Sequence, residues 1–178
     1  MDELQHFLRL VDAQLADPCK VVVVGGAALA LGYCPELTVA EIVLWRSTDD
    51  VIWTAAERAS ETIPRPIRVR QAMVGEPRHP FEDRVWQPPI TGLKLLEVWV
   101  PEAHDQMLLK AARAESLESV TELHRVHPLT LATLEERYRE AVGHVSGPRS
   151  RFRTGFLALV ARLYGPAKAE QVGKHLKE

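Results

Sequence analysis

The chain has few cysteines, and they form neither a zinc-binding nor a disulfide pattern. Only Cys19 and Cys34 occur among its 178 residues, too few for a disulfide framework and at a spacing that matches no zinc site. Both are predicted to be buried, reduced thiols. The sequence also lacks a Gly-x-Ser-x-Gly elbow, a Walker loop and a His-Glu-x-x-His motif, so none of these assigns a reaction.

Long apolar runs and a strong excess of one charge are also missing. No apolar stretch approaches the roughly 20 residues that span a bilayer, and the polar, acidic start Met1–His6 is unlike a signal peptide. The net charge of −2, from 22 Lys and Arg against 24 Asp and Glu, requires neither nucleic acid nor a membrane surface. We therefore expect a cytoplasmic protein with no membrane partner.

The apolar pattern predicts a small sheet followed by helices. A helix is expected over residues 3–16, with a Pro- and Gly-rich irregular segment at 74–92. Strands are expected at 19–24, 38–46, about 67–70 and 93–100, and early helices at 27–31 and after a cap at Thr48, Asp49 or Asp50. Further helices are expected from Pro101 to about Val126, over 130–141, around 152–163 and at the C-terminus.

These elements define the fold class and two parts of the chain. The fold class is α+β, with a small mixed β-sheet, flanking helices and a helical C-terminal half. Residues 1–100 are predicted to form the α/β core, and residues 101–178 the helical part packed on it.

Paired glycines end the first strand. Gly25 and Gly26 follow four valines, and a short run of small residues begins at Ala27. Glycines at such a turn let backbone N–H groups approach a phosphate closely, and a helix N-terminus adds a favourable partial charge. The same residues also suit a tight strand-to-helix turn that binds no ligand, so the pattern leaves both interpretations open.

The second predicted strand has a single acidic residue. Nucleotidyl transfer generally uses divalent metal ions, and two carboxylates at positions i and i+2 of a strand can bind such ions jointly. Glu41 is the only acid within residues 38–46, and its i+2 neighbour is Val43. The other register pairs Ala40 with Ile42, which leaves no acid at all.

A lysine in an apolar stretch is the third candidate for a functional role. Lys110 follows two leucines in the helix predicted after Pro101, and Arg113 comes three residues later. A lysine in this place can reach phosphate oxygens. Equally, its stem can cover the edge of the core while its amine stays in water.

In this order, the three segments resemble the AbiEii-type nucleotidyltransferases of bacterial toxin–antitoxin and abortive-infection systems, which are polymerase-β-like. In that family the opening reads Gly-Gly-x-Ala-Leu, the second strand Arg-x-Thr-x-Asp-hydrophobic-Asp, and a later segment Pro-Glu-Asp, a Leu/Lys pair, Arg and an acidic run. The matching residues, within about 19–126, are Gly25, Gly26, Ala28, Leu29, Thr38, Pro101, Glu102, Leu109, Lys110 and Arg113.

The resemblance implies a sheet of nucleotidyltransferase type and a nucleotide site. The residues that it assigns to this site are Gly25, Gly26, Thr38 and Lys110. Glu41 is the only candidate for a catalytic carboxylate in the second strand, and no metal ligands can be assigned.

The departures from the family pattern concern the charged residues. Glu36 stands in place of the arginine, and in the late acidic run Ser116 and Ser119 stand where aspartates are expected. Each missing carboxylate removes charge that would hold a metal ion. Losing metal stabilisation raises the barrier by several kcal/mol, about a thousandfold or more in rate.

We therefore expect a catalytically degenerate, nucleotidyltransferase-like protein that binds a nucleotide or a protein partner as a regulatory component, in a toxin–antitoxin or defence system. No cofactor is expected. The first alternative is an active enzyme that moves a nucleotide from a nucleoside triphosphate to RNA or protein. That enzyme would need Mg²⁺, held by Glu41 with an acid such as Glu97. The second alternative is a purely structural interaction module.

Other polar clusters favour structural roles. His124 and His127 have a His-x-x-His spacing but no further metal ligand nearby. The arginines around Phe152 and Phe156 are interpreted as a solvated helix face whose aromatics point into the core, although a patch for RNA has the same pattern. Trp86 is interpreted as a packing residue, with the wall of a cleft as the alternative.

Overall fold

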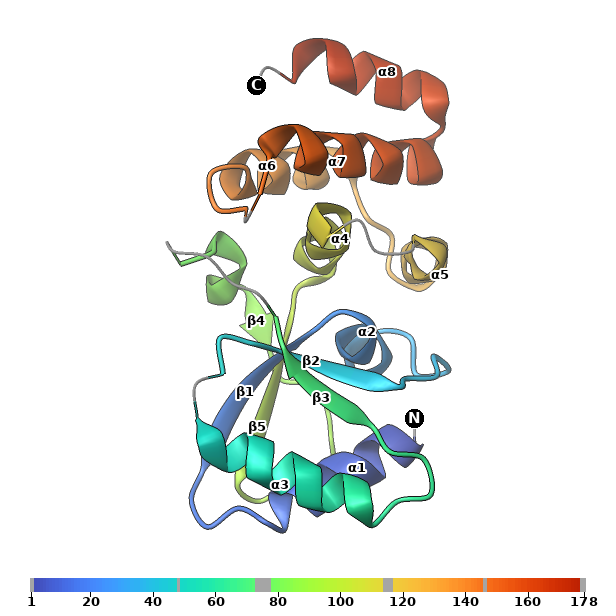
Figure 1. Ribbon diagram of the computed structural model, residues 1–178. Coiled ribbons are helices and arrows are strands. Elements are labelled where there is room, and N and C mark those ends of the chain that lie inside the picture. The colour runs from blue at the N-terminus through green and yellow to red at the C-terminus, as the bar shows by residue number, and fades with distance from the viewer. Residues whose placement is uncertain (1, 48, 73–77, 114–116, 146, 177–178) are drawn as a thin grey trace. The chain divides into compact units, whose positions relative to one another are not determined.

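The computed structural model describes residues 2–47, 49–72, 78–113, 117–145 and 147–176, and Figure 1 shows their helices and strands. The chain divides into two compact units, each described by itself. The first is Met1–Val74 with Val85–Pro101, and the second is Gly75–Arg84 with Glu102–Glu178. The second unit thus includes residues 75–84, which we predicted with the first part.

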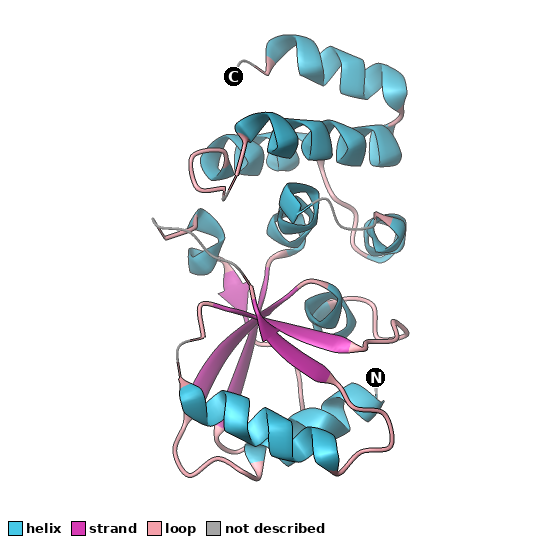
Figure 2. Ribbon diagram, viewed as in Figure 1, coloured by secondary structure: helices cyan, strands magenta, loops and turns pink. Residues whose placement is uncertain are grey.

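The described part of the first unit holds a five-stranded mixed sheet with the strand order β3-β2-β1-β5-β4. Strand β1 is antiparallel to β2 and parallel to β5, β2 is parallel to β3, and β4 is antiparallel to β5. Figure 2 shows these strands among the helices. The predicted α+β class is therefore confirmed. The strands are β1 (Cys19–Val24), β2 (Glu41–Trp45), β3 (Arg68–Gln71), β4 (Val85–Trp86) and β5 (Leu96–Pro101).

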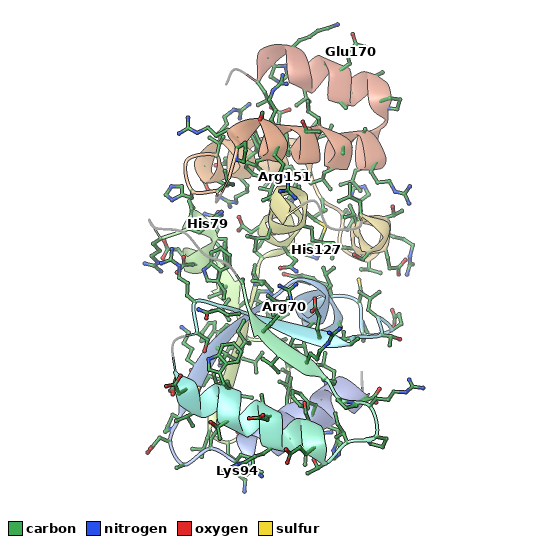
Figure 3. All side chains as sticks on the ribbon, in the orientation of Figure 1. Arg70, His79, Lys94, His127, Arg151 and Glu170 are labelled. Carbon is green, nitrogen blue, oxygen red and sulfur yellow. The ribbon has the colours of Figure 1, made fainter. Side chains whose placement is uncertain are left out.

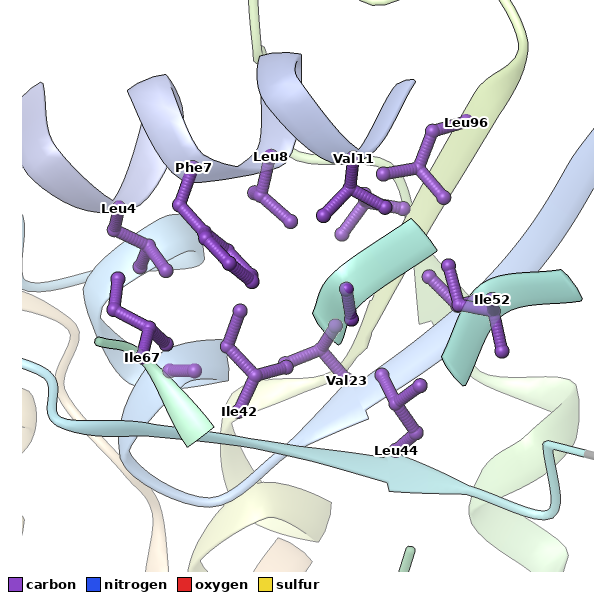
Figure 4. Packing of buried hydrophobic residues seen from close by; sticks show 14 of the residues in the cluster. Leu4, Phe7, Leu8, Val11, Val23, Ile42, Leu44, Ile52, Ile67 and Leu96 are labelled. Atoms are coloured by element: carbon purple, nitrogen blue, oxygen red, sulfur yellow. The ribbon is translucent and has the colours of Figure 1, made fainter. Parts of the chain in front are cut away.

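Three helices pack their apolar sides into the core of this unit. They are α1 (Asp2–Asp12), α2 (Gly26–Gly32) and α3 (Asp50–Glu61). Alternate strand residues point into the same core because side chains of a strand alternate between its two faces. Figure 4 shows Ile42, Leu44 and Val23 pointing toward the apolar side of α1. As predicted, Asp49 caps α3, and its side chain accepts the backbone N–H of Val51 at 2.9 Å.

The second unit is helical in its described residues. Phe152 and Phe156 are buried and stack on Tyr138, with ring centroids 4.8 and 4.4 Å apart. This confirms that these aromatics face the core. No described helix has the length and apolar character that a membrane span requires. The elements are η1 (Pro80–Asp83), α4 (Ala103–Arg113), α5 (Glu118–Val126), α6 (Leu131–Ala141), α7 (Arg149–Tyr164) and α8 (Pro166–His175).

Two predictions about the middle of the chain were wrong. Pro101 is the last residue of β5 rather than a residue of the first turn of a helix, and its carbonyl accepts a hydrogen bond from the Tyr33 hydroxyl at 2.8 Å. A proline is tolerated there because the hydrogen bond to the β4 side comes from the backbone N–H of Glu102 to the carbonyl of Arg84, at 3.0 Å, and not from residue 101. The segment 74–92, predicted as irregular, contains η1 and β4. The His79 side chain caps η1 through the backbone N–H of Phe81.

A buried carboxylate joins the end of α1 to the start of β5. Asp12 is 6% exposed, and its Oδ1 accepts the backbone N–H groups of Lys94, Leu95 and Leu96 at 2.9, 2.8 and 2.7 Å. Burial raises the pKa of this carboxyl, but the three N–H donors outweigh burial, so its pKa lies below the ordinary value. The charged form of Asp12 therefore stabilises the fold.

Replacing Asp12 by alanine should lower the free energy of unfolding by about 2–3 kcal/mol at pH 7, because three buried N–H groups lose their acceptor. A carboxyl with a lowered pKa stabilises the fold above its unfolded pKa of about 3.9, and this contribution is lost as the pH falls through the folded pKa. Urea denaturation at several pH values should show the gap between wild type and variant closing in acid. The exposed Asp17 serves as the control through Asp17→Ala. An equal loss of stability at every pH would contradict this role.

A partly buried ion pair links elements of the second unit. Arg84 donates two hydrogen bonds to Asp105, from Nε at 2.7 Å and from Nη2 at 2.8 Å, and Nη2 lies 3.0 Å from Glu140. The hydrogen bonds to Asp105 raise the pKa of Arg84. Arg84, which follows η1, is thereby connected to Asp105 of α4, and its contact with Glu140 connects it to α6 as well.

Helices α4 and α7 approach each other closely at a glycine. A Cβ atom added at Gly155 would collide with the backbone carbonyl of Ala111. The site therefore excludes any side chain.

The variant Gly155→Ala should lower the free energy of unfolding by about 3 kcal/mol, because α7 must move away from α4 to admit the methyl group. Gly173→Ala is the matched control. Its Cβ would lie 3.5 Å from Leu157, an ordinary contact, and alanine is favoured over glycine in a helix by about 1 kcal/mol. Denaturation of the two variants measures the difference. Equal stabilities would show that the helices do not pack in this way.

Candidate nucleotide site

In the Gly25-Gly26 turn, Gly25 is buried and Gly26 is exposed. Gly25 has φ 75° and ψ −147°, a conformation that residues with side chains rarely adopt. Gly26 is exposed, and a Cβ atom added there would meet no atom within 4 Å. Because α2 spans only seven residues, its dipole adds little. The feature that matters is space for a ligand atom beside the backbone of Gly26.

The register of β2 decides which of its residues face this turn. Val24, the residue before the glycines, pairs with Val43, so the turn and Glu41 lie beyond this pair, at the same end of the two strands. Ile42 is 2% exposed and belongs to the core. Glu41 and Val43 therefore lie on the face of β2 opposite to Ile42, where Glu41 is partly exposed and Val43 is buried. In the alternative register, Ile42 belongs to the core, and Ala40 is exposed and precedes the strand.

Glu41 forms an ion pair with an arginine of the next strand. Arg70 donates from Nε to Oε2 at 2.9 Å and from Nη2 to Oε1 at 3.1 Å, a two-point contact. The two side chains are 51% and 42% exposed, and Figure 3 labels Arg70. Arg68 lies directly opposite Glu41 in the strand register, on the same face. Two arginines beside one carboxylate make this patch net positive.

The remaining predicted residues lie outside β2. Thr38 is exposed and precedes β2 by three residues. Lys110 belongs to α4 of the second unit, where it is 6% exposed. Glu97, suggested as a second metal ligand, pairs with Lys20, four residues before Val24 on β1. That offset is about 13 Å along the strand, so Glu97 does not join Glu41 and this suggestion was wrong.

The described donors do not fit a magnesium site. Mg²⁺ prefers six oxygen ligands in near-octahedral geometry, including one or two carboxylates. Glu41 is already neutralised by Arg70, and Val43 offers no donor. No group of three or more His, Cys, Asp or Glu side chains with metal-binding geometry exists within the described ranges. Glu115 and Ser116, part of the expected acidic run, lie outside them.

The other polar candidates have structural roles. Nδ1 of His124 accepts the backbone N–H of Leu129 at 3.0 Å, which fixes the turn before α6. Trp86 donates from Nε1 to the Tyr33 hydroxyl at 2.8 Å and packs against the core. Cys19 and Cys34 are buried free thiols, as predicted.

Comparisons with protein-family models, with curated proteins and with solved structures find no match for this chain. A function must therefore be argued from the chemistry of the glycine turn and of the side chains beside it. Sequence reasoning missed Arg70 as a partner of Glu41. The available signal was the alternation of Arg68 and Arg70 with apolar residues in a short strand, which places both arginines on one face.

A double-mutant cycle on Glu41→Gln and Arg70→Gln should give a coupling energy of about 0.5–1 kcal/mol, because both side chains are half exposed. The coupling should shrink as salt is added. Arg65→Gln, at an exposed position outside the pair, controls for the loss of one positive charge. Zero coupling at low salt would show that the two side chains do not meet in solution.

Proposed function

We propose that this chain is a nucleotidyltransferase-like protein that binds a nucleotide without transferring it, and that it acts as a regulatory component. The observation that carries the proposal is the pairing of Glu41, the only carboxylate of β2, with Arg70. In the family that the sequence resembles, two acids occupy this strand and hold metal. Here a guanidinium cation takes the place beside the single acid.

The glycine turn and the two arginines supply groups that suit a phosphate. Open backbone at Gly26 permits close approach, and Arg68 and Arg70 lie two strands away, about 10 Å across the sheet. Guanidinium groups bind phosphate oxygens through paired hydrogen bonds and need no metal to do so. Thr38 is proposed to contribute as the resemblance implies, whereas Lys110, which the resemblance also assigns, belongs to the second unit.

Nucleotide binding should therefore be independent of divalent metal. Calorimetry with ATP, GTP, CTP and UTP is expected to give affinities in EDTA at least equal to those in Mg²⁺, because free triphosphate carries more negative charge for the arginines. Bound nucleotide should also raise the melting temperature. Absence of heat and of stabilisation with all four nucleotides would instead support the structural interaction module.

Gly26→Val tests the position of the phosphate. A branched side chain at this open position should block the ligand and weaken binding by about tenfold or more, with little change in stability because nothing lies within 4 Å. Gly143→Val is the matched control, since a Cβ atom there also meets nothing within 4 Å. Equal binding by the two variants would place the nucleotide elsewhere.

The enzyme alternative has its own test. Incubation with labelled nucleoside triphosphates, Mg²⁺ or Mn²⁺ and total RNA should leave the label in the nucleotide. Transfer of label to RNA or to a protein, lost in Glu41→Ala, would overturn the proposal and restore a metal-dependent enzyme. The setting in a toxin–antitoxin or defence system comes from the resemblance alone.

A further inference from the structure

Strand β3 borders a groove that shares Arg68 and Arg70 with the nucleotide proposal but does not include the glycine turn. Among the described residues, β3 is the last strand on its side of the sheet, and it pairs with β2 in parallel. The backbone N–H of Arg68 bonds to the carbonyl of Ala40 at 3.2 Å, and that of Ala72 to the carbonyl of Leu44 at 2.8 Å. In a parallel pair, alternate residues direct both backbone groups to the same side. Val69 and Gln71 therefore direct theirs away from β2.

The groove between this edge and α3 has a volume of about 670 Å³. Its floor is apolar and includes Trp53, Ala56, Ile67 and Val69. The Ser60 hydroxyl donates to the carbonyl of Ile67 at 2.7 Å, which satisfies the backbone just before the strand. Of the two residues whose backbone groups point away from β2, Val69 lines the groove and Gln71 ends the strand beyond it.

The two rims of the groove carry opposite charge. Arg68 and Arg70 line it from the strand, and Glu57 and Glu61 line it from α3. Arg70 is engaged with Glu41, whereas Arg68 is exposed. The strand rim therefore attracts carboxylates, and the helix rim repels a segment that is acidic throughout.

We infer that the edge of β3 binds an extended segment of a partner protein, which adds a strand to the sheet. The segment alternates acidic and apolar residues. Its acidic side chains meet Arg68 on the face away from the core, and its apolar side chains lie on Trp53 and Val69. Main-chain hydrogen bonds to Val69 and Gln71 supply affinity, and the alternation supplies specificity.

A second copy of this chain is a poor occupant. If two β3 strands paired antiparallel about Val69, Arg68 of one would lie opposite Arg70 of the other. Like charges directly across a strand pair are destabilising. The inferred surface is the kind that the protein partner in the proposed function would need, but it rests on the β3 edge and not on the glycine turn.

The test uses the full chain and a fluorescein-labelled peptide, Thr-Glu-Val-Glu-Val-Glu-Thr. Fluorescence polarisation is expected to show saturable binding below about 1 mM, the weak end of specific association. Two control peptides, one with the same residues in blocks and one with valine replaced by glutamate, should bind about tenfold more weakly or worse. No binding of the alternating peptide at about 1 mM overturns the inference.

Two variants locate the site. Arg68→Glu should lower the affinity for the alternating peptide by about tenfold, and this variant should instead bind a peptide in which lysine replaces glutamate. Arg65→Glu, also at an exposed position, should change the affinity for neither peptide. Val69→Pro removes an N–H that points away from β2, so it should abolish binding while the ladder to β2 persists. Unchanged binding in both Arg68→Glu and Val69→Pro overturns the inference.

Amide hydrogen exchange in the wild-type protein gives an independent readout. Without peptide, the amides of Val69 and Gln71 should exchange fast and those of Arg68 and Ala72 slowly, because only the latter two bond to β2. Bound peptide should slow the amide hydrogen exchange of Val69 and Gln71. Protection that does not change contradicts strand addition even if the peptide binds. Gly26→Val should leave peptide binding intact, which separates failure here from failure of the nucleotide proposal.

Discussion

The pairing of β1 with β2 fixes which side chains of β2 are available to a ligand. A slip of one residue would turn Ile42 out of the core and bury Glu41 instead. The burial of Ile42 and Leu44 against α1 and α3 therefore sets the chemistry at the glycine turn. It leaves Glu41 as the partly exposed carboxylate of β2 and Val43 as a buried residue on the same face, beside the arginines of β3.

The same carboxylate takes part in two features of the first unit. Glu41 ends its strand beside the glycine turn, and it also lines the groove along β3 through its pair with Arg70. Arg70 balances the charge of Glu41, and Arg68 leaves the sheet edge net positive. This pairing also leaves Arg68 as the more accessible positive group toward either a phosphate or an acidic side chain.

Local patterns predicted local structure well. The strand at 19–24, the helix after the glycines and a cap among Thr48, Asp49 and Asp50 follow from the sequence because neighbouring residues determine them. The partner of Glu41 could not be predicted from neighbouring residues, because Arg70 lies 29 residues away and contacts Glu41 only when β3 pairs with β2. Pro101 was misassigned because proline suits both a first helical turn and the end of a strand. The site residues Gly25, Gly26, Thr38 and Lys110 came from the resemblance, and whether they bind a nucleotide together stays a prediction.

Asp12 forms hydrogen bonds with residues that are synthesised much later than itself. Its three N–H donors lie more than 80 residues downstream, and β5, which they begin, covers the flank of β1 opposite β2. A nascent chain that stops short of residue 94 has α1 and β1 but no β5. One edge of β1, its most apolar strand, then has no neighbouring strand, and an unpaired edge promotes pairing with other chains. The N-terminal unit is thus completed late in translation, only when residues on both sides of η1 have emerged.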